Sequence, residues 1–371
     1  MNNQERLDWL RLARTENVGP VTFNQLMGRY GSAGEALAAI PELAAKGGLK
    51  RKLSIPGKSS VEEELKATER LGAKILLSCD ADYPRLLKQL SDAPPVLAVH
   101  GHAGLLSNPC VAIVGARNAS LNGRRFAEKL ARGLSEAGWV VVSGLAAGID
   151  ASAHQGALVK GTIGVIAGGI DVIYPPENEQ LHKQMTAQGC VVAEMPYATP
   201  INAKLFPRRN RIVSGLSRGV IVIEAAVQSG SLITARMAAD QGREVMAVPG
   251  SPLDPRSGGT NKLIKDGATL IEGVEDVLAA LKAPAAQESE PVAYRNQPIV
   301  NITENDLSSL RPKVLEALSP TPTPVDELIR LCQTPAPMVL AILLELELAG
   351  RITRLPGHQV ALISAATAAS A

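Results

Sequence analysis

The segment with the clearest chemistry is Lys204-Leu205-Phe206-Pro207-Arg208-Arg209-Asn210-Arg211, which carries four cations, no acid and one of the three phenylalanines of the chain. Cations neutralise phosphates, and an aromatic ring stacks on an unpaired base. The arginines fall at an expected helix start, where the helix dipole favours anions, so they cost stability unless an anion binds. The segment therefore predicts a site for phosphates and an unstacked base. The alternative is a solvated helix start in which Phe206 fills the core.

A glycine and an arginine follow the strand-like run 111–114. Gly115 lets the backbone approach an anion beside the guanidinium of Arg117, which suits a phosphate. The pattern lacks the second and third glycines of a dinucleotide fingerprint and is not a P-loop. An ion pair of Arg117 with Asp150 or Glu224 is an equally good interpretation.

Three other loops that follow expected strands, 143–150, 228–234 and 258–262, combine glycines with hydroxyl or amide side chains. Such groups can bind an anion, but they also form turns and helix caps. Capping is favoured in 143–150, where Asp150 is expected to cap the next helix. Because the carboxyl ends of strands in a wound sheet share one edge, we expect these loops to gather there with the cationic segment.

The loop 168–176 also follows a strand and contains paired glycines. Glu177 and Glu179, just beyond it, would repel phosphate, so we expect this loop to support a site rather than to touch a nucleic acid. Tyr174 in the same loop is expected to be a packed ring rather than a platform for a base.

Groups suited to catalysis form no recognised motif. Ser143, His154 and Asp150 are a conceivable triad, but the sequence around Ser143 does not resemble a nucleophile elbow. The four cysteines lie far apart, without the paired spacing of a zinc site or a redox dithiol. The N-terminus has no signal-peptide pattern, and no apolar run reaches membrane-spanning length. We expect a cytoplasmic binding protein without catalytic activity, metal or cofactor.

Strands and helices alternate from 110 to 282, which is typical of a doubly wound parallel sheet. Short runs of Val, Ile and Ala predict strands covered on both faces. These strands are Cys110–Gly115, Trp139–Ser143, Thr162–Ala167, Cys190–Met195, Gly219–Glu224, Glu244–Pro249 and Thr269–Ile271. Ala73–Ser78 and Val96–His100 are expected as additional edge strands. A net charge of +2 on 371 residues limits any nucleic-acid site to a local patch.

Helices are expected on both sides of this region. Residues 5–71 read as four short helices, and a glycine turn at 17–20 resembles a helix-hairpin-helix or a SAM-like bundle. Such a turn can offer N–H groups to a phosphate, although a structural role is favoured. The C-terminal part reads as a winged helix whose expected recognition helix, Pro335–Ala349, contains no Lys or Arg. A protein partner or intramolecular docking is therefore favoured over duplex DNA.

The expected domains are a helical domain at 1–72, an extended Rossmann-like domain at 73–283, a linker at 284–306 and a winged helix at 307–371. The linker assignment rests on a polar, proline-punctuated sequence, for which we expect disorder.

Several motifs, in order and in spacing, resemble the DprA/Smf family of DNA-processing proteins over about residues 75–275. They are Val114-Gly115-Ala116-Arg117, Ser143-Gly144 with Gly148-Ile149-Asp150, Gly169 with Asp171 and Tyr174-Pro175, Phe206–Leu216, Glu224 with Ser229-Gly230-Ser231 and Thr234-Ala235, Ala247–Gly250, and Gly259-Thr260-Asn261. Two positions depart from the family pattern: Asn122, where an aromatic residue is frequent, and Ala198, where a glycine is usual.

The resemblance implies an extended Rossmann-like fold, a homodimer formed through that domain, and no known catalytic activity. It implies a cytoplasmic protein that binds and protects incoming single-stranded DNA during natural transformation and loads RecA onto it. The residues assigned to DNA binding are Gly115, Arg117, Ser143, Gly144, Lys204, Phe206, Arg208, Arg209, Asn210, Arg211, Ser229, Gly230, Ser231, Thr234 and Asn261.

A nucleotide-processing enzyme is the alternative, because the expected sheet also resembles that of the lysine-decarboxylase-like phosphoribohydrolases. Those enzymes carry a PGGxGTxxE signature. The chain has Pro249-Gly250-Ser251 in its place, and Glu224 stands alone. Binding of single-stranded DNA is therefore the favoured prediction.

Overall fold

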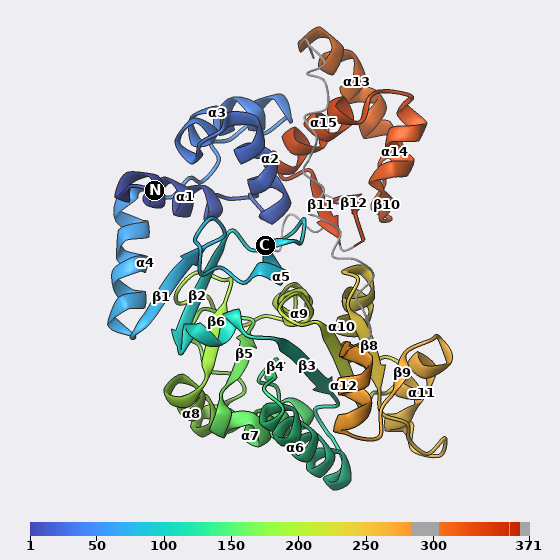
Figure 1. Cartoon of the computed structure of the whole chain (residues 1–371). Helices are drawn as coiled ribbons and strands as arrows, with labels where there is room; N and C mark the ends of the chain where they lie inside the picture. Colours follow the sequence, from blue (N-terminus) through green and yellow to red (C-terminus); the bar gives the residue numbers. More distant parts are fainter. Residues whose placement is uncertain (283–303, 356, 364–371) are drawn as a thin grey trace. The chain divides into compact units, whose positions relative to one another are not determined.

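The computed structural model describes residues 1–282, 304–355 and 357–363 (Figure 1). The chain divides into two compact units. One spans 63–289 and holds a large sheet, and the other combines 1–62 with the C-terminal part from 290 onward. The expected linker at 284–306 lies mainly outside the described residues, so both the linker and the expected domain boundaries stay predictions.

The central unit is built on a nine-stranded sheet with the order β1-β2-β6-β5-β4-β3-β7-β8-β9. Strands β3 to β9 pair in parallel, and β1 and β2 are joined antiparallel at one side. The strands are β1 Ala73–Leu77, β2 Val96–Gly101, β3 Cys110–Gly115, β4 Val140–Ser143, β5 Thr162–Ile166, β6 Cys190–Ala193, β7 Gly219–Ile223, β8 Glu244–Ala247 and β9 Thr269–Leu270. The predicted doubly wound sheet is confirmed, although β2 lies one strand in from the edge.

Helices cover both faces of this sheet. They are α5 Arg85–Lys88, α6 Leu121–Glu136, α7 Ile149–Ala157, α8 Glu179–Gln188, α9 Leu205–Gly215, α10 Gly230–Asp240, α11 Gly258–Lys265 and α12 Val274–Lys282. Successive residues of β3 alternate between two cores: Ala112 and Val114 pack with α9 and α10, whereas Val111 and Ile113 pack with α6, α7 and α12. Figure 1 shows the same three layers. Burial on both sides explains why these strands are apolar throughout.

The order of the strands reverses at the centre of the sheet. From β3 the chain runs outward through β4, β5 and β6, and α9 then returns it to β7 on the other side of β3. Ligands of open α/β sheets bind beyond the carboxyl ends of the strands near such a reversal. The cationic segment begins α9, and it therefore lies at this edge.

The second unit contains the N-terminal helices and a small winged helix. Its elements are α1 Asn3–Ala13, α2 Pro20–Tyr30, α3 Ala33–Lys46, α13 Glu304–Ala317, β10 Thr323–Pro324, α14 Val325–Cys332, α15 Ala336–Leu348, β11 Ile352–Leu355 and β12 Gln359–Leu362. Helix α4, Lys58–Arg70, joins the two units in sequence. In the described ranges no single helix has both the length and the apolar composition to cross a bilayer; α14 and α15 meet these criteria only as a pair, bent by 119°.

The backbone at Ala198 shows the physical reason why a glycine is usual at this position. Its φ is 61°, a left-handed conformation that costs an L-residue roughly 1–2 kcal/mol and glycine almost nothing. The turn is held in place because the Ala198 backbone N–H donates to Asp171 Oδ1 at 2.8 Å.

We predict that Ala198→Gly raises the free energy of unfolding by up to about 1 kcal/mol, because relief of the left-handed strain exceeds the added entropy of the unfolded chain. Ala203→Gly is the matched control, since Ala203 is not among the residues with positive φ and should lose about 0.5 kcal/mol. Denaturant unfolding measures both changes. Loss of stability in Ala198→Gly would contradict the strain.

Candidate nucleic-acid interface

Loops from three adjacent strands meet in one small pocket at the carboxyl edge of the sheet. The loop after β4 contributes two residues, the end of β5 and its loop three, and the segment from β6 into α9 three more. The lining residues are Gly144, Ala146, Ile166, Ala167, Tyr174, Ile201, Phe206 and Arg209. The cavity volume is about 10 Å³, roughly room for one water molecule. A ligand as large as a base can therefore meet these residues only from outside.

An aromatic pair and a guanidinium lie at the rim of this pocket. The Tyr174 and Phe206 ring centroids are 5.8 Å apart, with 53° between the ring planes. The guanidinium carbon of Arg117, from the loop after β3, lies 5.0 Å from the Phe206 centroid. This geometry is a cation–π contact and brings a fourth loop to the site. Phe206 is half-buried, so it neither fills the core nor projects freely into solvent.

Tyr174 differs from its expected role as a packed ring. We expected a packed ring, but 42% of the side chain is exposed next to Phe206. Its place in a loop at the carboxyl end of β5, on the same edge as the cationic segment, was the available signal. The acids that follow in the sequence do not prevent this ring from facing the site.

Arg117, Lys204 and Arg208 are exposed at this edge, and none of the three forms an ion pair among the described residues. Lys204 and Arg208 are four residues apart, so they lie on the same side of the first turn of α9. Arg117 pairs with neither Asp150 nor Glu224 among the described residues, which removes the structural alternative for its charge. These cations remain available to phosphates.

Arg209 lies beneath the surface and is only 7% exposed. Its Nη1 donates to the carbonyl oxygen of Val165 at 2.9 Å. A Cβ on Gly144 would lie 1.6 Å from this nitrogen, so any side chain at position 144 would clash with the guanidinium. Burial lowers the pKa of Arg209 to about 10, and burial also raises the pKa of Asp150. The nearby Asp150 opposes this effect on the pKa of Arg209, so the guanidinium is held under the pocket beside an acid.

Arg211 does not face the site, which corrects the expectation that all four cations of the segment do. It is 7% exposed, and Nη2 donates to Glu194 Oε1 at 2.5 Å. The Asp92 carbonyl accepts a second bond, and the Asp92 carboxylate lies 3.7 Å from Nε. Because α9 is helical, this side chain points to Glu194 after β6 and to the loop before β2 rather than to the rim.

Ser143 and Asp150 hold the loop after β4 together. Ser143 is fully buried and donates to the Ile113 carbonyl at 2.6 Å. Asp150 Oδ2 accepts the N–H groups of Gly144 at 3.1 Å and Ala146 at 3.4 Å. The expectation that Asp150 is a helix N-cap is wrong, because Gly148 has that position in α7. Its carboxylate instead fixes the turn that makes room for Arg209.

The conceivable triad is not assembled. The Nδ1 of His154 lies 2.9 Å from the hydroxyl of Thr162, and Ser143 donates to a carbonyl. Burial lowers the pKa of His154 to about 3, so the ring is neutral at physiological pH. Ser143 and His154 therefore lack the hydrogen bond that activates a nucleophile.

Glu224 occupies the position at the start of α6 where a nucleotide phosphate binds in many Rossmann-like folds. Its carboxylate accepts the Ser120 backbone N–H at 2.8 Å and also the Ser120 hydroxyl. A Cβ on Gly123 would lie 2.6 Å from the same carboxylate. The residue has a positive φ of 50°, so the backbone is strained to place it there. An internal carboxylate thus excludes a phosphate from this helix start.

Packing and helix hydrogen bonds account for the contacts of Gly115 and Asn210, two further residues assigned to DNA binding. A Cβ on Gly115 would lie 1.9 Å from the Ile223 carbonyl oxygen and 2.6 Å from Ile149, so glycine is needed for packing of β3 against its neighbours. Asn210 is half-buried, and its carbonyl accepts a bond from Ser214.

Five predicted residues follow β7 and β8 and do not line the pocket: Ser229, Gly230, Ser231, Thr234 and Asn261. Ser229 caps α10, and its hydroxyl lies 2.7 Å from that of Ser231. The Asn261 amide bonds the Gly250 backbone in both directions, at 3.1 and 2.9 Å. Capping and turn formation account for these contacts, and a role in DNA binding stays a prediction.

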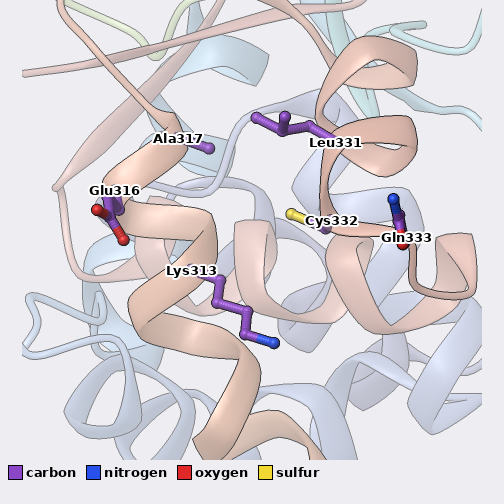
Figure 2. Close-up of a pocket in the computed structure, with 6 residues that line it drawn as sticks. All are labelled: Lys313, Glu316, Ala317, Leu331, Cys332 and Gln333. Carbon is purple, nitrogen blue, oxygen red and sulfur yellow. The ribbon is translucent and has the colours of Figure 1, made fainter.

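A larger pocket lies in the winged helix, between α13 and α14 (Figure 2). Its volume is about 450 Å³, and its lining is Lys313, Glu316, Ala317, Leu331, Cys332 and Gln333. Burial raises the pKa of the Cys332 thiol, which disfavours the reactive thiolate. No predicted site residue lies here. Within the described ranges, no group of His, Cys, Asp and Glu is arranged to hold a metal ion.

We predict that Glu194→Gln lowers the free energy of unfolding by about 3 kcal/mol, because it leaves the buried Arg211 cation without its main partner. The control is Glu194→Leu combined with Arg211→Met, which removes both charges and should recover most of the loss. Denaturant unfolding measures both. An unchanged stability in Glu194→Gln would show that the pair does not hold Arg211 in place.

Comparison with known proteins places the whole chain in one family. The model described as DNA recombination-mediator protein A matches residues 74–282. A DprA-like N-terminal HHH domain matches 3–67, and a DprA winged helix domain matches 302–358. These matches agree with the sheet and with the two flanking folds.

Relatives and solved structures agree with these matches. Protein Smf of Synechocystis sp. is 33% identical over 96% of this chain and 98% of its own, and DNA processing protein DprA of Bacillus subtilis is 45% identical over 61% and 77%. The X-ray structure of DprA from Streptococcus pneumoniae has a TM-score of 0.62 at 34% identity, covering 75% of this chain and 98% of that one. A Helicobacter pylori structure, described for its single-stranded DNA binding mode, has a TM-score of 0.52 at 31% identity, covering 56% and 95%. The chain belongs to the DprA/Smf family of DNA-processing proteins.

Proposed function

We propose that the chain binds single-stranded DNA at the rim surface, which we define as Arg117, Tyr174, Lys204, Phe206 and Arg208. The observation that carries this proposal is the exposed set of unpaired cations around a half-exposed aromatic pair. Cations that track a phosphate backbone, with a ring on which a base stacks, are the usual means of binding single strands without sequence preference.

The charges of the rim residues and the size of the pocket indicate which residues contact phosphates and which stack on a base. Arg117, Lys204 and Arg208 neutralise phosphates, while Arg209 is buried below them and bonds the Val165 carbonyl. The pocket behind the rings is too small for a base, so a base stacks on the outer faces of Phe206 and Tyr174. The site contacts no base edge in this mode, and binding is independent of sequence.

The comparisons support this mode. The Helicobacter pylori relative is described by its single-stranded DNA binding mode, and the chain shares its fold over 95% of that structure. The family description as a recombination mediator supports a partner that acts on the bound strand. We propose that this partner is RecA, loaded onto DNA protected during natural transformation in the cytoplasm, that the chain forms a homodimer through its Rossmann-like domain, and that it is not an enzyme.

The nucleotide-processing alternative has weaker support. Its phosphate would need the start of α6, and Glu224 occupies that position. No pair of carboxylates lines the pocket at the rim. Binding therefore remains the function that the geometry supports best.

Removal of the exposed guanidiniums should weaken binding and reduce its dependence on salt. Arg117→Ala/Arg208→Ala should lower affinity for oligo-dT by roughly tenfold or more at moderate salt. The slope of log K against log salt should fall by about 1.4, since each phosphate contact contributes about 0.7 for single strands. Fluorescence anisotropy across salt concentrations measures both quantities.

The matched control is Arg218→Ala. Arg218 is an exposed arginine of the same unit, but it precedes β7 and so lies at the opposite, amino-terminal edge of the sheet. Its removal should change neither affinity nor slope. Equal losses in the two proteins would mean that the overall charge, and not the rim surface, attracts DNA.

The aromatic pair should contribute stacking without changing the salt dependence. Phe206→Ala should cost about 1–3 kcal/mol of binding free energy, and Tyr174→Ala a similar amount, whereas Tyr174→Phe should retain affinity. The slope against salt should stay that of the wild type, because no cation is removed.

An abasic oligonucleotide provides the control for stacking. The wild type should bind it more weakly than oligo-dT, and Phe206→Ala should bind it as well as the wild type does, since no base remains to stack. If Phe206→Ala loses as much affinity for the abasic strand, the ring acts on the phosphates through Arg117, and the stacking proposal is wrong.

A further inference from the structure

Helix α15 is buried on both of its faces. Its C-terminal half contains a continuous run of buried residues, Ile342 to Leu348. A helix that is apolar all round must be covered all round. One face packs in the winged-helix core through Val339, Leu343 and Leu346. A recognition helix of a DNA-reading winged helix would instead leave its other face open to a groove.

The other face of α15 completes the core of the N-terminal helices. Leu344 and Leu348 belong to the cluster formed by Leu12, Phe23 and Leu26 of α1 and α2 together with residues of α3. The backbones also approach closely, since a Cβ on Gly47 would lie 2.0 Å from the Glu345 carbonyl oxygen. The N-terminal helices therefore share a hydrophobic core with α15.

Polar contacts fix α15 against the glycine turn at 17–20. The Asn17 side chain donates to the Leu348 carbonyl at 3.1 Å, and the Thr22 hydroxyl donates to Glu347 Oε2 at 2.5 Å. Glu347 also accepts from Arg354 at 2.7 Å. Its other oxygen lies 3.9 Å from the Cβ position of Gly19, the N-cap of α2. A carboxylate thus lies beside the turn whose N–H groups could otherwise meet a phosphate.

The buried acids of α15 are compensated inside the unit. Arg311 donates to Glu345 at 2.7 and 3.1 Å. Arg354 donates to Glu347 and, at 3.3 Å, to Gln25 of α2. Both ion pairs lie within the winged helix, so undocking would leave them intact but would break the bonds from Thr22 and Asn17 and the bond from Arg354 to Gln25. The shared apolar core and these three polar contacts favour a lasting association of the two parts.

We propose that the winged helix is an intramolecular docking module. Helix α15 and the 17–20 turn, the two elements of this unit that resemble duplex-binding motifs, mask each other. Neither reads duplex DNA, and the two ends of the chain form one cooperative folding unit. The N-terminal helices then depend on residues more than 300 positions away in the sequence.

Hydrogen exchange of the full-length chain tests this coupling from both sides. In Leu344→Ala/Leu348→Ala, amides of α2 and α3 should exchange roughly tenfold faster or more, although the changes lie in the winged helix. In Thr22→Val, which removes the hydroxyl donor to Glu347, amides of α15 should exchange faster in the same way. Leu331→Ala, at a side chain 68% exposed on α14, should leave α1 to α3 unchanged.

The outcomes separate the alternatives. Changes confined to the mutated domain would overturn the proposal, and this holds even if the double leucine variant unfolds the winged helix, because α1 to α3 would then stay protected. A short duplex added to the wild type should leave exchange of α15 unaltered. Protection of α15 by the duplex would show that the helix is available to a groove and would equally overturn the proposal.

Discussion

The site depends on the directions in which the four cations at the start of α9 point. Helix α9 begins within a run of four cations, and helical geometry sends them in different directions. Arg209 and Arg211 are buried and donate hydrogen bonds to the Val165 carbonyl and to Glu194, respectively. Lys204 and Arg208 are exposed at the surface. Phe206 remains at the rim between Arg117 and Tyr174. The inward arginines hold the helix in place, and the outward cations are therefore presented at a fixed distance from a rigid ring pair.

Internal carboxylates determine where phosphate does not bind. Glu224 fills the start of α6, and Glu347 lies beside the start of α2. Both positions are helix N-termini that favour anions. At α6 the carboxylate accepts a backbone N–H, and at α2 it lies beside the turn and accepts the Thr22 hydroxyl. At the rim surface, by contrast, Arg117, Lys204 and Arg208 are exposed beside an aromatic pair. This arrangement favours an extended polyanion over a mononucleotide held in a crevice.

The spacing of apolar residues and the positions of glycines predicted the doubly wound sheet well. Strands β3 to β9 are short apolar segments separated by glycine-rich turns. The direction in which each cationic side chain points was harder to predict from the sequence. The sequence alone showed four cations in eight residues, but the partner of Arg211 is 17 positions away and that of Arg117 is 89. Such long-range pairs depend on the packing of the folded layers. Tyr174 was misjudged for the same reason, since its exposure follows from the path of the loop after β5.

The most direct test of the rim surface is photo-crosslinking with an oligonucleotide that carries 5-iododeoxyuridine, followed by mass spectrometry of the crosslinked peptide. This probe reacts efficiently with an aromatic ring on which its base stacks. The account predicts crosslinks at Phe206 or Tyr174 in the full chain. Crosslinks that avoid both rings and map instead to the loops after β7 and β8, or to the winged helix, would contradict it.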